Sequence, residues 1–420
     1  MLIRPVRLRR LPLLRIIIAL LTLLLLDALL LVASRPAAPA SLSSPVSPRH
    51  TAENGGDIFI ASIHRDSAPL LHASWSDALL RLVEALGQDS SVHVSIAEAY
   101  SSDGTRNELR QLQLGLERLG ASNTFTYGMT GHELATLVDN PPVPRNMKGG
   151  WLWLERERQW AFRETPLLAS LRNEALVPLR RLQQEEGRTF DRILWVDDHA
   201  IFEPDDVVEL LNTRGGNYTT ACATTLDPSS RLAEATATRD DQGNPILSSR
   251  WPWFLSPTSR AAVQKGAPVA VRSCWGGLVA MNAAPFYDND VNLAFRAIDD
   301  SLADKRIEAD ETCLLQVDRA GARGVWMNPS VRLARTPEEY DRVRRGQVPW
   351  QSVVLGSWAN RLGRWFSASA VDADLRSRVQ AWSRGVPGRS PDRYEPGVHC
   401  LFDGTRVVRR KPILRLPWQA

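Results

Sequence analysis

The sequence lacks any stripe in which basic and aromatic residues alternate, so we expect no nucleic acid among its partners. A formal net charge of +4 excludes little, because five arginines lie within the first fifteen residues. Charged residues make up 23% and hydrophobic residues 44% of the chain, which is typical of a globular protein. With 420 residues, the chain is long enough for one large domain or two closely packed ones.

Long apolar runs are also missing, with one exception, the segment IIIALLTLLLLDALLLV at residues 16–32. With its flanks it is long enough to cross a hydrocarbon core of about 30 Å. Arginines precede it, whereas only Arg35 follows closely, so the positive-inside rule predicts a cytosolic amino terminus and a lumenal remainder. A cleaved signal peptide is the alternative. We therefore expect three segments: a cytosolic tail (1–15), a transmembrane signal-anchor (16–33) and a flexible stem rich in Pro, Ala and Ser (34–56).

Cysteine is scarce, and no two cysteines have the close spacing of a zinc site. The four residues are Cys222, Cys274, Cys313 and Cys400. All follow the apolar run, and an oxidising lumen would pair them in one of three ways. The only glycosylation sequon begins at Asn217, and it is usable only in the secretory pathway.

Apolar periodicity predicts alternating strands and helices from residue 57 onward. Strands are expected at 57–63 and 92–96, with a helix at 76–86 between them. Thr105 and Glu108 have the spacing of a capping box that would start the next helix. Alternation continues to about residue 224, through a helix from Thr165 and strands at 193–196 and 218–224. Beyond it, the periodicity fades, and further strands are expected at 268–272, 278–281 and 325–329. The pattern favours an α/β domain whose sheet is covered by helices.

The strand Ile193–Val196 runs directly into Asp197 and Asp198. Ligands bind at the carboxyl edge of such sheets, and adjacent carboxylates there suit Mg²⁺ or Mn²⁺, ions that often share substrate phosphates. This chemistry is typical of a nucleotide-sugar transferase. The alternative is that both carboxylates only cap the loop and the next helix.

Taken together, several stretches of the chain resemble the fungal capsule-associated proteins and α-1,3-mannosyltransferases of glycosyltransferase family sixty-nine. They keep the family's order over roughly residues 57–332. The stretches are 95–98, 102–105, 171–179, 193–198, 211–214, 239–240, 271–277, 311–313 and 328–329. Two departures leave the donor and acceptor open: Asp197-Asp198 stands where the family usually has Asn-Asp, and residues 234–238 hold no aromatic side chain.

The resemblance implies a Golgi type II membrane protein with a GT-A-like (Rossmann-like) mixed sheet over residues 57–335. A helical extension over 336–420 is expected to pack on this domain. The implied activity is metal-assisted transfer of mannose from GDP-mannose to a cell-surface or capsular glycan, with retention and an α-1,3 linkage.

Site residues follow from the same resemblance and from the chemistry of their side chains. We expect Asp198 to be the main metal ligand, with Asp197 and His399 as further ligands, and Glu311 to be catalytic beside Asp198. The remaining candidates fall into two sets. Donor-binding residues are Glu98, Asp103, Arg172, Asn173, Arg239 and Asp240, and sugar-contacting residues are Trp275, Gly276 and Gly277.

Arg172 and Asn173 lie off the apolar line of their helix, so we expect them to face solvent or a ligand. Cys274 is expected to pair with Cys313, because each lies beside a family-like loop. The leading hypothesis is a mannosyltransferase. The alternatives are a non-catalytic capsule-associated or glycan-export factor that keeps the fold, and a lumenal lectin-like module.

Overall fold

The computed structural model describes residues 11–35, 56–87, 91–141, 149–227, 229–288, 290, 292–319, 323–344, 346–366, 370–384 and 393–408. Most of the expected cytosolic tail and almost all of the expected stem, residues 1–10 and 36–55, lie outside this set.

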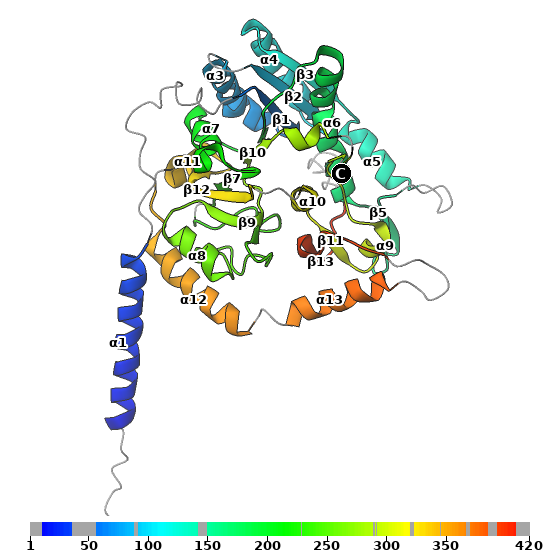
Figure 1. Cartoon of the computed structure of the whole chain (residues 1–420). Helices are drawn as coiled ribbons and strands as arrows, with labels where there is room; N and C mark the ends of the chain where they lie inside the picture. The colour runs from blue at the N-terminus through cyan, green and yellow to red at the C-terminus, as the bar shows by residue number, and fades with distance from the viewer. Residues whose placement is uncertain are drawn as a thin grey trace, which may run out of the picture.

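The strands form one large sheet and two small ones (Figure 1). They are β1 Ile58–His64, β2 Val92–Glu98, β3 Ser122–Tyr127, β4 Trp151–Leu154, β5 Gln159–Phe162, β6 Arg192–Val196, β7 Thr220–Thr225, β8 Arg239–Asp240, β9 Val269–Ser273, β10 Leu278–Asn282, β11 Ile307–Ala309, β12 Val325–Leu333 and β13 Leu401–Asp403.

The nine-stranded sheet has the order β3-β2-β1-β6-β10-β7-β12-β9-β8. Strands β3, β2, β1 and β6 are parallel. β10 is antiparallel to both of its neighbours, β6 and β7, and β12 is parallel to β7 but antiparallel to β9. The sheet is therefore a Rossmann-like half followed by a mixed half, which confirms the expected GT-A-like mixed sheet.

Helices cover the sheet and continue into the carboxyl-terminal part of the chain. They are α1 Leu11–Ala33, α2 Ala68–Leu70, α3 Ser76–Leu86, α4 Thr105–Arg118, α5 Gly131–Asp139, α6 Glu164–Glu186, α7 Pro204–Leu211, α8 Pro257–Gln264, α9 Asp300–Ala303, α10 Glu311–Asp318, α11 Pro337–Arg344, α12 Trp350–Phe366 and α13 Ala370–Ser383.

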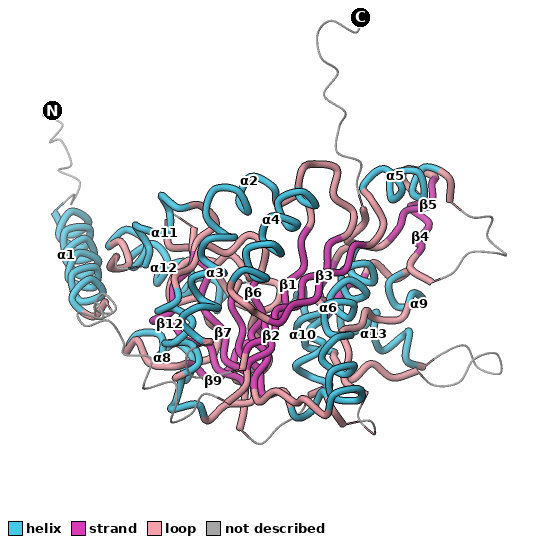
Figure 2. The backbone as a smooth tube through the Cα atoms, turned by 90° about the horizontal axis from the view of Figure 1, so that it is seen from above, coloured by secondary structure: helices cyan, strands magenta, loops and turns pink. Residues whose placement is uncertain are grey.

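Two helix groups lie on opposite sides of the parallel strands (Figure 2). α3 packs against α4 and α7, whereas α6 packs on β1 and β2 and touches α10. The predicted apolar face of α3 is buried at Leu79, Leu82, Val83 and Leu86. Burial of such an apolar stripe stabilises a helix more than its intrinsic propensity does.

The expected capping box at Thr105 and Glu108 is wrong. Gly104 precedes α4, and Thr105 is the first helical residue. The Thr105 hydroxyl instead accepts hydrogen bonds from the backbone N–H groups of Ser67 and Ala68 at 2.8 and 3.1 Å. It thereby ties α4 to the loop that follows β1.

All four cysteines are paired, as Cys222–Cys274 and Cys313–Cys400. The predicted Cys274–Cys313 pair is therefore wrong, although the two residues belong to neighbouring parts of the fold. The Ser273 hydroxyl lies 3.1 Å from the Cys313 sulfur. Because successive side chains of an extended segment point to opposite sides, Ser273 faces α10 while Cys274 faces β7.

The carboxyl-terminal segment is joined to the preceding part of the chain by the Cys313–Cys400 disulfide and by the antiparallel pairing of β13 with β11. The expected division into a domain over 57–335 and an extension over 336–420 stays a prediction. At the other end of the chain, α1 contains a stretch, Leu14–Ala33, that is long and apolar enough to cross a membrane.

Candidate active site

The two adjacent carboxylates after β6 have opposite surroundings. Asp197 is buried, and its Oδ1 and Oδ2 accept hydrogen bonds from the indoles of Trp195 and Trp275 at 3.1 and 2.8 Å. The Arg172 guanidinium lies 3.5 Å from Oδ1. Burial raises the pKa of Asp197, and Arg172 opposes that rise. Its carboxylate is thus turned inward and already supplied with donors.

Asp198 points the other way and keeps 22% of its side chain exposed. Its Oδ2 accepts the Arg65 backbone N–H at 3.2 Å, and Oδ1 lies 3.0 Å from His199 Nδ1. Burial alone would raise the pKa of Asp198, but the His199 hydrogen bond and nearby histidine charges lower it below its usual value. Asp198 is therefore the ionised, solvent-reachable member of the pair.

His199 lies between two carboxylates. Its Nδ1 contacts Asp198, and its Nε2 is 3.6 Å from Glu234 Oε1. Burial would lower the pKa of His199, but the hydrogen bond to Asp198 and the ion pair with Glu234 outweigh burial and raise it to about 10. Glu234 is also held by Arg335 at 3.0 Å. The two carboxylates and the imidazole form a compact polar group at the edge of the sheet.

Sequence reasoning did not select His199 or Glu234 as site residues. His199 could have been chosen because it directly follows Asp198. Glu234 gave no local signal, because it comes from the irregular segment after β7 and meets His199 only in the folded chain.

A second group surrounds Arg172 on α6. Its Nε donates to Glu311 Oε1 at 3.1 Å, and its guanidinium lies 4.6 Å from the Trp275 ring and 5.0 Å from the Trp195 ring. Arg172 is buried, so of the two expected surroundings, solvent or a ligand, solvent is excluded. The side of α6 that carries Arg172 is covered by Asp197, Glu311 and Trp275, whereas Glu174 and Val177 on the same helix stay exposed.

Glu311 is the first residue of α10 and is buried. Burial and the neighbouring Asp310 raise the pKa of Glu311 to about 7, against the opposing charge of Arg172. A carboxyl group with a pKa near 7 is suited to proton transfer at neutral pH. Arg172 therefore connects the inward carboxylate of Asp197, after β6, to Glu311, a candidate acid or base.

Other expected donor-binding residues make contacts within the protein. Glu98 is buried and pairs with Arg106 at 2.5 Å. Asp103 accepts the backbone N–H groups of Thr105 and Ala68 at 3.0 and 3.2 Å. Asn173 bonds the backbone N–H and carbonyl of Phe295 at 2.9 and 2.8 Å. These contacts hold the loops after β2 and the segment that follows β10.

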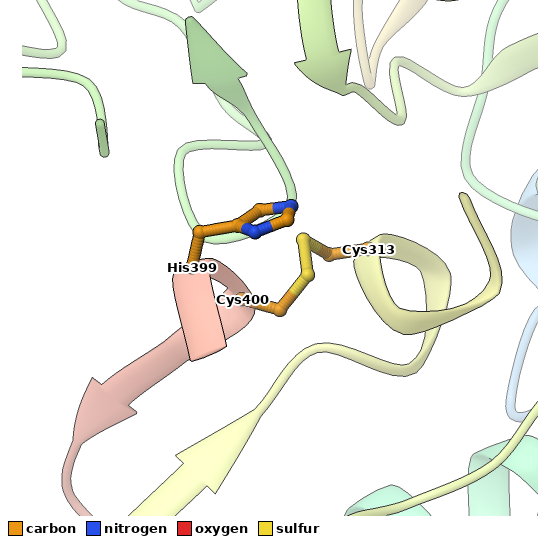
Figure 3. A group of neighbouring side chains, drawn as sticks. All are labelled: Cys313, His399 and Cys400. Carbon is orange, nitrogen blue, oxygen red and sulfur yellow. A yellow bond between two sulfur atoms is a disulfide. The ribbon is translucent and has the colours of Figure 1, made fainter. Parts of the chain in front are cut away.

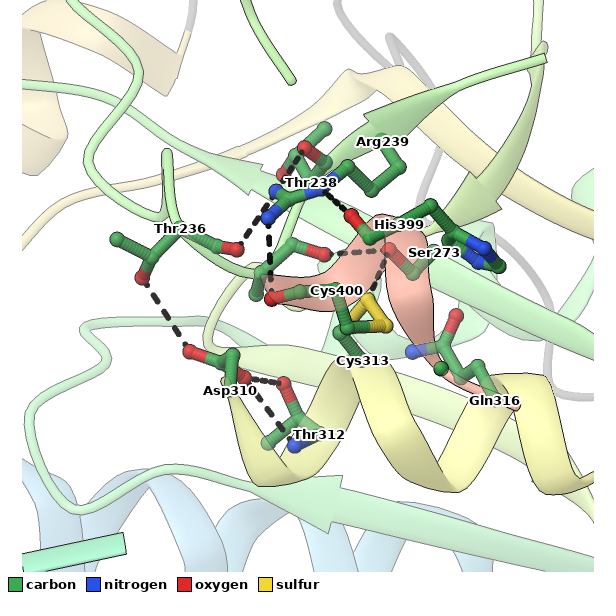
Figure 4. The surroundings of a disulfide bond; sticks show 12 residues. Thr236, Thr238, Arg239, Ser273, Asp310, Thr312, Cys313, Gln316, His399 and Cys400 are labelled. Atoms are coloured by element: carbon green, nitrogen blue, oxygen red, sulfur yellow. Dashed lines mark hydrogen bonds between the residues drawn. A yellow bond between two sulfur atoms is a disulfide. The ribbon is translucent and has the colours of Figure 1, made fainter. Parts of the chain in front are cut away.

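Arg239 binds the carboxyl-terminal segment, whereas Asp240 holds the loop that follows β8. The Arg239 guanidinium donates to the carbonyls of Thr236, Thr238, His399 and Cys400 (Figure 4). Asp240 accepts the backbone N–H groups of residues 242, 244 and 256. Both side chains are buried.

Trp275 is buried and bonds Asp197, so its ring faces Arg172 and forms no open platform for a sugar. The adjacent glycines allow close packing of the backbone. A Cβ on Gly276 would lie 1.9 Å from the Ala223 carbonyl oxygen, and Gly277 has φ +77°, a conformation that favours glycine. Within the described residues, Trp275, Gly276 and Gly277 therefore pack inside the protein next to the site and do not form its open surface.

His399 lies beside the Cys313–Cys400 disulfide (Figure 3). Both sulfurs are bonded to each other, so neither is the thiolate that a soft metal site requires. Burial, with the charges of Arg239 and Arg272, lowers the pKa of His399. Among the described contacts, none joins His399 to Asp198.

The sequence model of the family described as cryptococcal mannosyltransferase 1 matches residues 57–318. The chain belongs to this family. The match runs from β1 to α10, so it includes every strand of the large sheet except β12, and it includes Asp198, Glu234 and Glu311. This mannosyltransferase family assignment confirms the resemblance inferred from the sequence.

No curated protein matches the chain. Among solved structures, it is similar to a mannosyltransferase from Pyrobaculum calidifontis in complex with GDP-Man and Mn²⁺, at 13% identity and a TM-score of 0.35, over 87% of this chain and 89% of that one. It is also similar to mannosyl-3-phosphoglycerate synthase from Rubrobacter xylanophilus, at 12% identity and a TM-score of 0.33, over 81% and 85% of the two chains. Similarities this weak assign no function.

Proposed function

We propose that the chain is a type II membrane protein of the Golgi that transfers mannose from GDP-mannose to a cell-surface or capsular glycan. Retention and an α-1,3 linkage are part of this proposal. The family membership supports mannosyl transfer. The observation that carries the catalytic reading is Asp198, an ionised and partly exposed carboxylate at the carboxyl end of a central strand.

The polar group around Asp198 fits a divalent cation by its chemistry. Asp198 and Glu234 supply hard carboxylate oxygens. His199, whose pKa of about 10 keeps it protonated between them, is not a ligand in that form, and a bound cation would take over its positive charge. Oxygen ligands suit Mg²⁺ and Mn²⁺, and such ions commonly share their coordination with substrate phosphates. When bound, the cation would neutralise the charge that develops on the departing diphosphate. Asp198 would be its main ligand.

Asp197 has a different role in this proposal. Its carboxylate orients Trp195, Trp275 and Arg172, and its backbone N–H donates to the Gly277 carbonyl at 2.9 Å. It therefore fixes the direction of the turn that carries Asp198. Asp197 is a positioning residue and not a second metal ligand.

Glu311 is the candidate proton-transfer residue. Its pKa near 7 leaves it partly ionised at neutral pH, and Arg172 holds its carboxylate in one orientation through the 3.1 Å hydrogen bond. An ionised Glu311 would accept the proton of the glycan hydroxyl while that oxygen bonds to the sugar on the face from which the diphosphate leaves, which keeps the configuration. Arg172 would stabilise the ionised form.

A donor screen with the purified full chain in detergent micelles tests this function. We expect mannose transfer, or slow release of GDP, from GDP-mannose with Mn²⁺ or Mg²⁺, and loss of both in EDTA. UDP-glucose and GDP-glucose serve as competing donors. Turnover of another donor would change the assigned sugar, whereas no metal-dependent turnover of any donor would favour the non-catalytic capsule-associated factor.

The lumenal topology is tested separately through Asn217, which is exposed. A type II orientation places this sequon in the lumen, so we expect an endoglycosidase-sensitive mobility shift in the wild type and none in Asn217→Gln. Protease protection that places residues after α1 in the cytosol would contradict the orientation.

A further inference from the structure

Helix α12 has an inner face that packs on the domain and an outer face that does not. On the inner face, Val353, Gly356, Ser357 and Asn360 are buried. Asn360 Nδ2 donates to the Phe254 carbonyl at 2.9 Å, and a Cβ on Gly356 would lie 2.0 Å from the Trp251 carbonyl. The inner face alone packs α12 on the domain. Packing on the domain therefore does not require apolar residues on the outer face.

The outer face is nevertheless apolar. Leu355, Trp358, Leu362 and Trp365 follow one another at spacings of three, four and three residues, which places them on one side of a helix. Leu355 is 56% exposed and Trp365 is 76% exposed. An exposed Trp and Leu stripe opposite a packed face is typical of a helix that lies in a membrane interface.

α12 also touches the helix expected to span the membrane. α1 packs against α12, and both Asp27 oxygens pair with the Arg361 guanidinium at 2.7 and 3.1 Å. Figure 1 shows α12 and α13 along the side of the domain from which α1 extends. The Asp27–Arg361 pair therefore fixes the position of α12 along the axis of α1.

The Asp27–Arg361 pair lies within the apolar part of α1. Asp27 precedes the end of α1 at Ala33 by six residues, which is about 9 Å at the rise of an α-helix. Leu29 and Leu30 lie beyond Asp27 and are exposed. α12 is thus beside a part of α1 that is still apolar, at a depth comparable with the roughly 5–10 Å to which interfacial helices insert.

We propose that α12 is an interfacial membrane helix, with Leu355, Trp358, Leu362 and Trp365 inserted in the lumenal leaflet beside α1. Arg361 and Arg364 flank this stripe, and Arg364 is exposed. Trp and Arg side chains are suited to the interface because each combines an apolar body with a polar end. The inference rests on the proposed membrane anchor, and it adds that the catalytic domain is held flat against the bilayer.

Introduced cysteines test the position of α12 directly, because all four native cysteines are paired. Leu362→Cys, Leu114→Cys and Leu24→Cys each place one thiol at a leucine of nearly equal exposure, 45%, 46% and 45%. Leu114 lies on α4, away from α1 (Figure 1). Each full-length variant is labelled with an environment-sensitive dye and reconstituted into phosphatidylcholine vesicles with or without nitroxide-labelled acyl chains.

We expect the nitroxide to quench the dye at Leu362 by about half, as for a side chain several ångströms into the interface, and to leave the dye at Leu114 unchanged. Quenching at Leu24 but not at Leu362 would overturn the inference while leaving the anchor intact. Quenching at Leu362 but not at Leu24 would support α12 and contradict a spanning α1. Equal signals at Leu362 and Leu114 would overturn the inference in either case.

Discussion

Asp197 and Asp198 are neighbours in sequence, yet their replacement by alanine is expected to lower stability by very different amounts. Asp197→Ala leaves the indole N–H groups of Trp195 and Trp275 without their acceptor, at about 1–3 kcal/mol for each buried donor. It also removes one partner of the buried cation Arg172, and breaking a buried ion pair costs about 3–5 kcal/mol.

These contributions share the same group and are not additive, so we expect a total loss of about 5 kcal/mol in the free energy of unfolding. For a domain of this size, such a loss lowers Tm by roughly 10 °C. Asp198→Ala removes a partly exposed carboxylate whose main partner, His199, keeps Glu234. Its expected cost is about 1 kcal/mol or less.

Thermal and denaturant unfolding of both variants, in the same detergent as the wild type, measures this difference. Asp197→Asn serves as an intermediate case, because its amide oxygen can accept one indole N–H but its amide nitrogen faces the other. Wild-type stability of Asp197→Ala, or a larger loss for Asp198→Ala than for Asp197→Ala, would refute the assignment of the inward and outward carboxylates.

Three further predictions follow from other parts of the structure. The pKa of Glu311 is raised to about 7, so the transfer rate of the wild type should rise with pH through about 7. Glu311→Gln should be slow and should lose that rise. An unchanged pH profile in the variant would exclude Glu311 as the base. Burial and the charges of Arg188 and Arg181 lower the pKa of His93 to about 4. Unfolded His93 binds its proton near pH 6.5, so its contribution to the free energy of unfolding is fully present above pH 6.5 and falls by about 3 kcal/mol as pH falls toward 4. The free energy of unfolding of His93→Gln should therefore depend less on pH between 4 and 6.5. An equal pH dependence in the variant and the wild type would contradict this. Peptide mapping without reduction should recover the two disulfides described above, and recovery of a linked Cys274–Cys313 peptide would contradict the fold around α10.

Local patterns in the sequence were sufficient for much of the fold. The apolar runs at β1, β2 and β6 and the periodicity of α3 predicted these elements, because each buries residues at the spacing of its own secondary structure. The antiparallel insertion of β10 between β6 and β7 was not visible, since an apolar strand reads the same in either direction. Strand order depends on contacts between distant segments.

The site was predictable only where neighbours in sequence act together. The acidic pair after β6 was found, but which carboxylate faces inward depends on Trp275 and Arg172, which come from β9's end and from α6. Arg172 was expected to face solvent or a ligand because a helix in isolation shows one apolar line. In the fold, α10 covers the opposite side and buries it.

The most direct test of the central claim compares mannose transfer from GDP-mannose in Mn²⁺ by the wild type, Asp198→Ala and Asp77→Ala. Asp77 is an exposed carboxylate on α3 and serves as the matched control. If Asp198 holds the cation that neutralises the leaving diphosphate, Asp198→Ala should lower the rate by a factor on the order of 10² or more, with unfolding close to that of the wild type, while Asp77→Ala should retain full activity. Transfer by Asp198→Ala at the wild-type rate would show that the metal site lies elsewhere and would contradict the account.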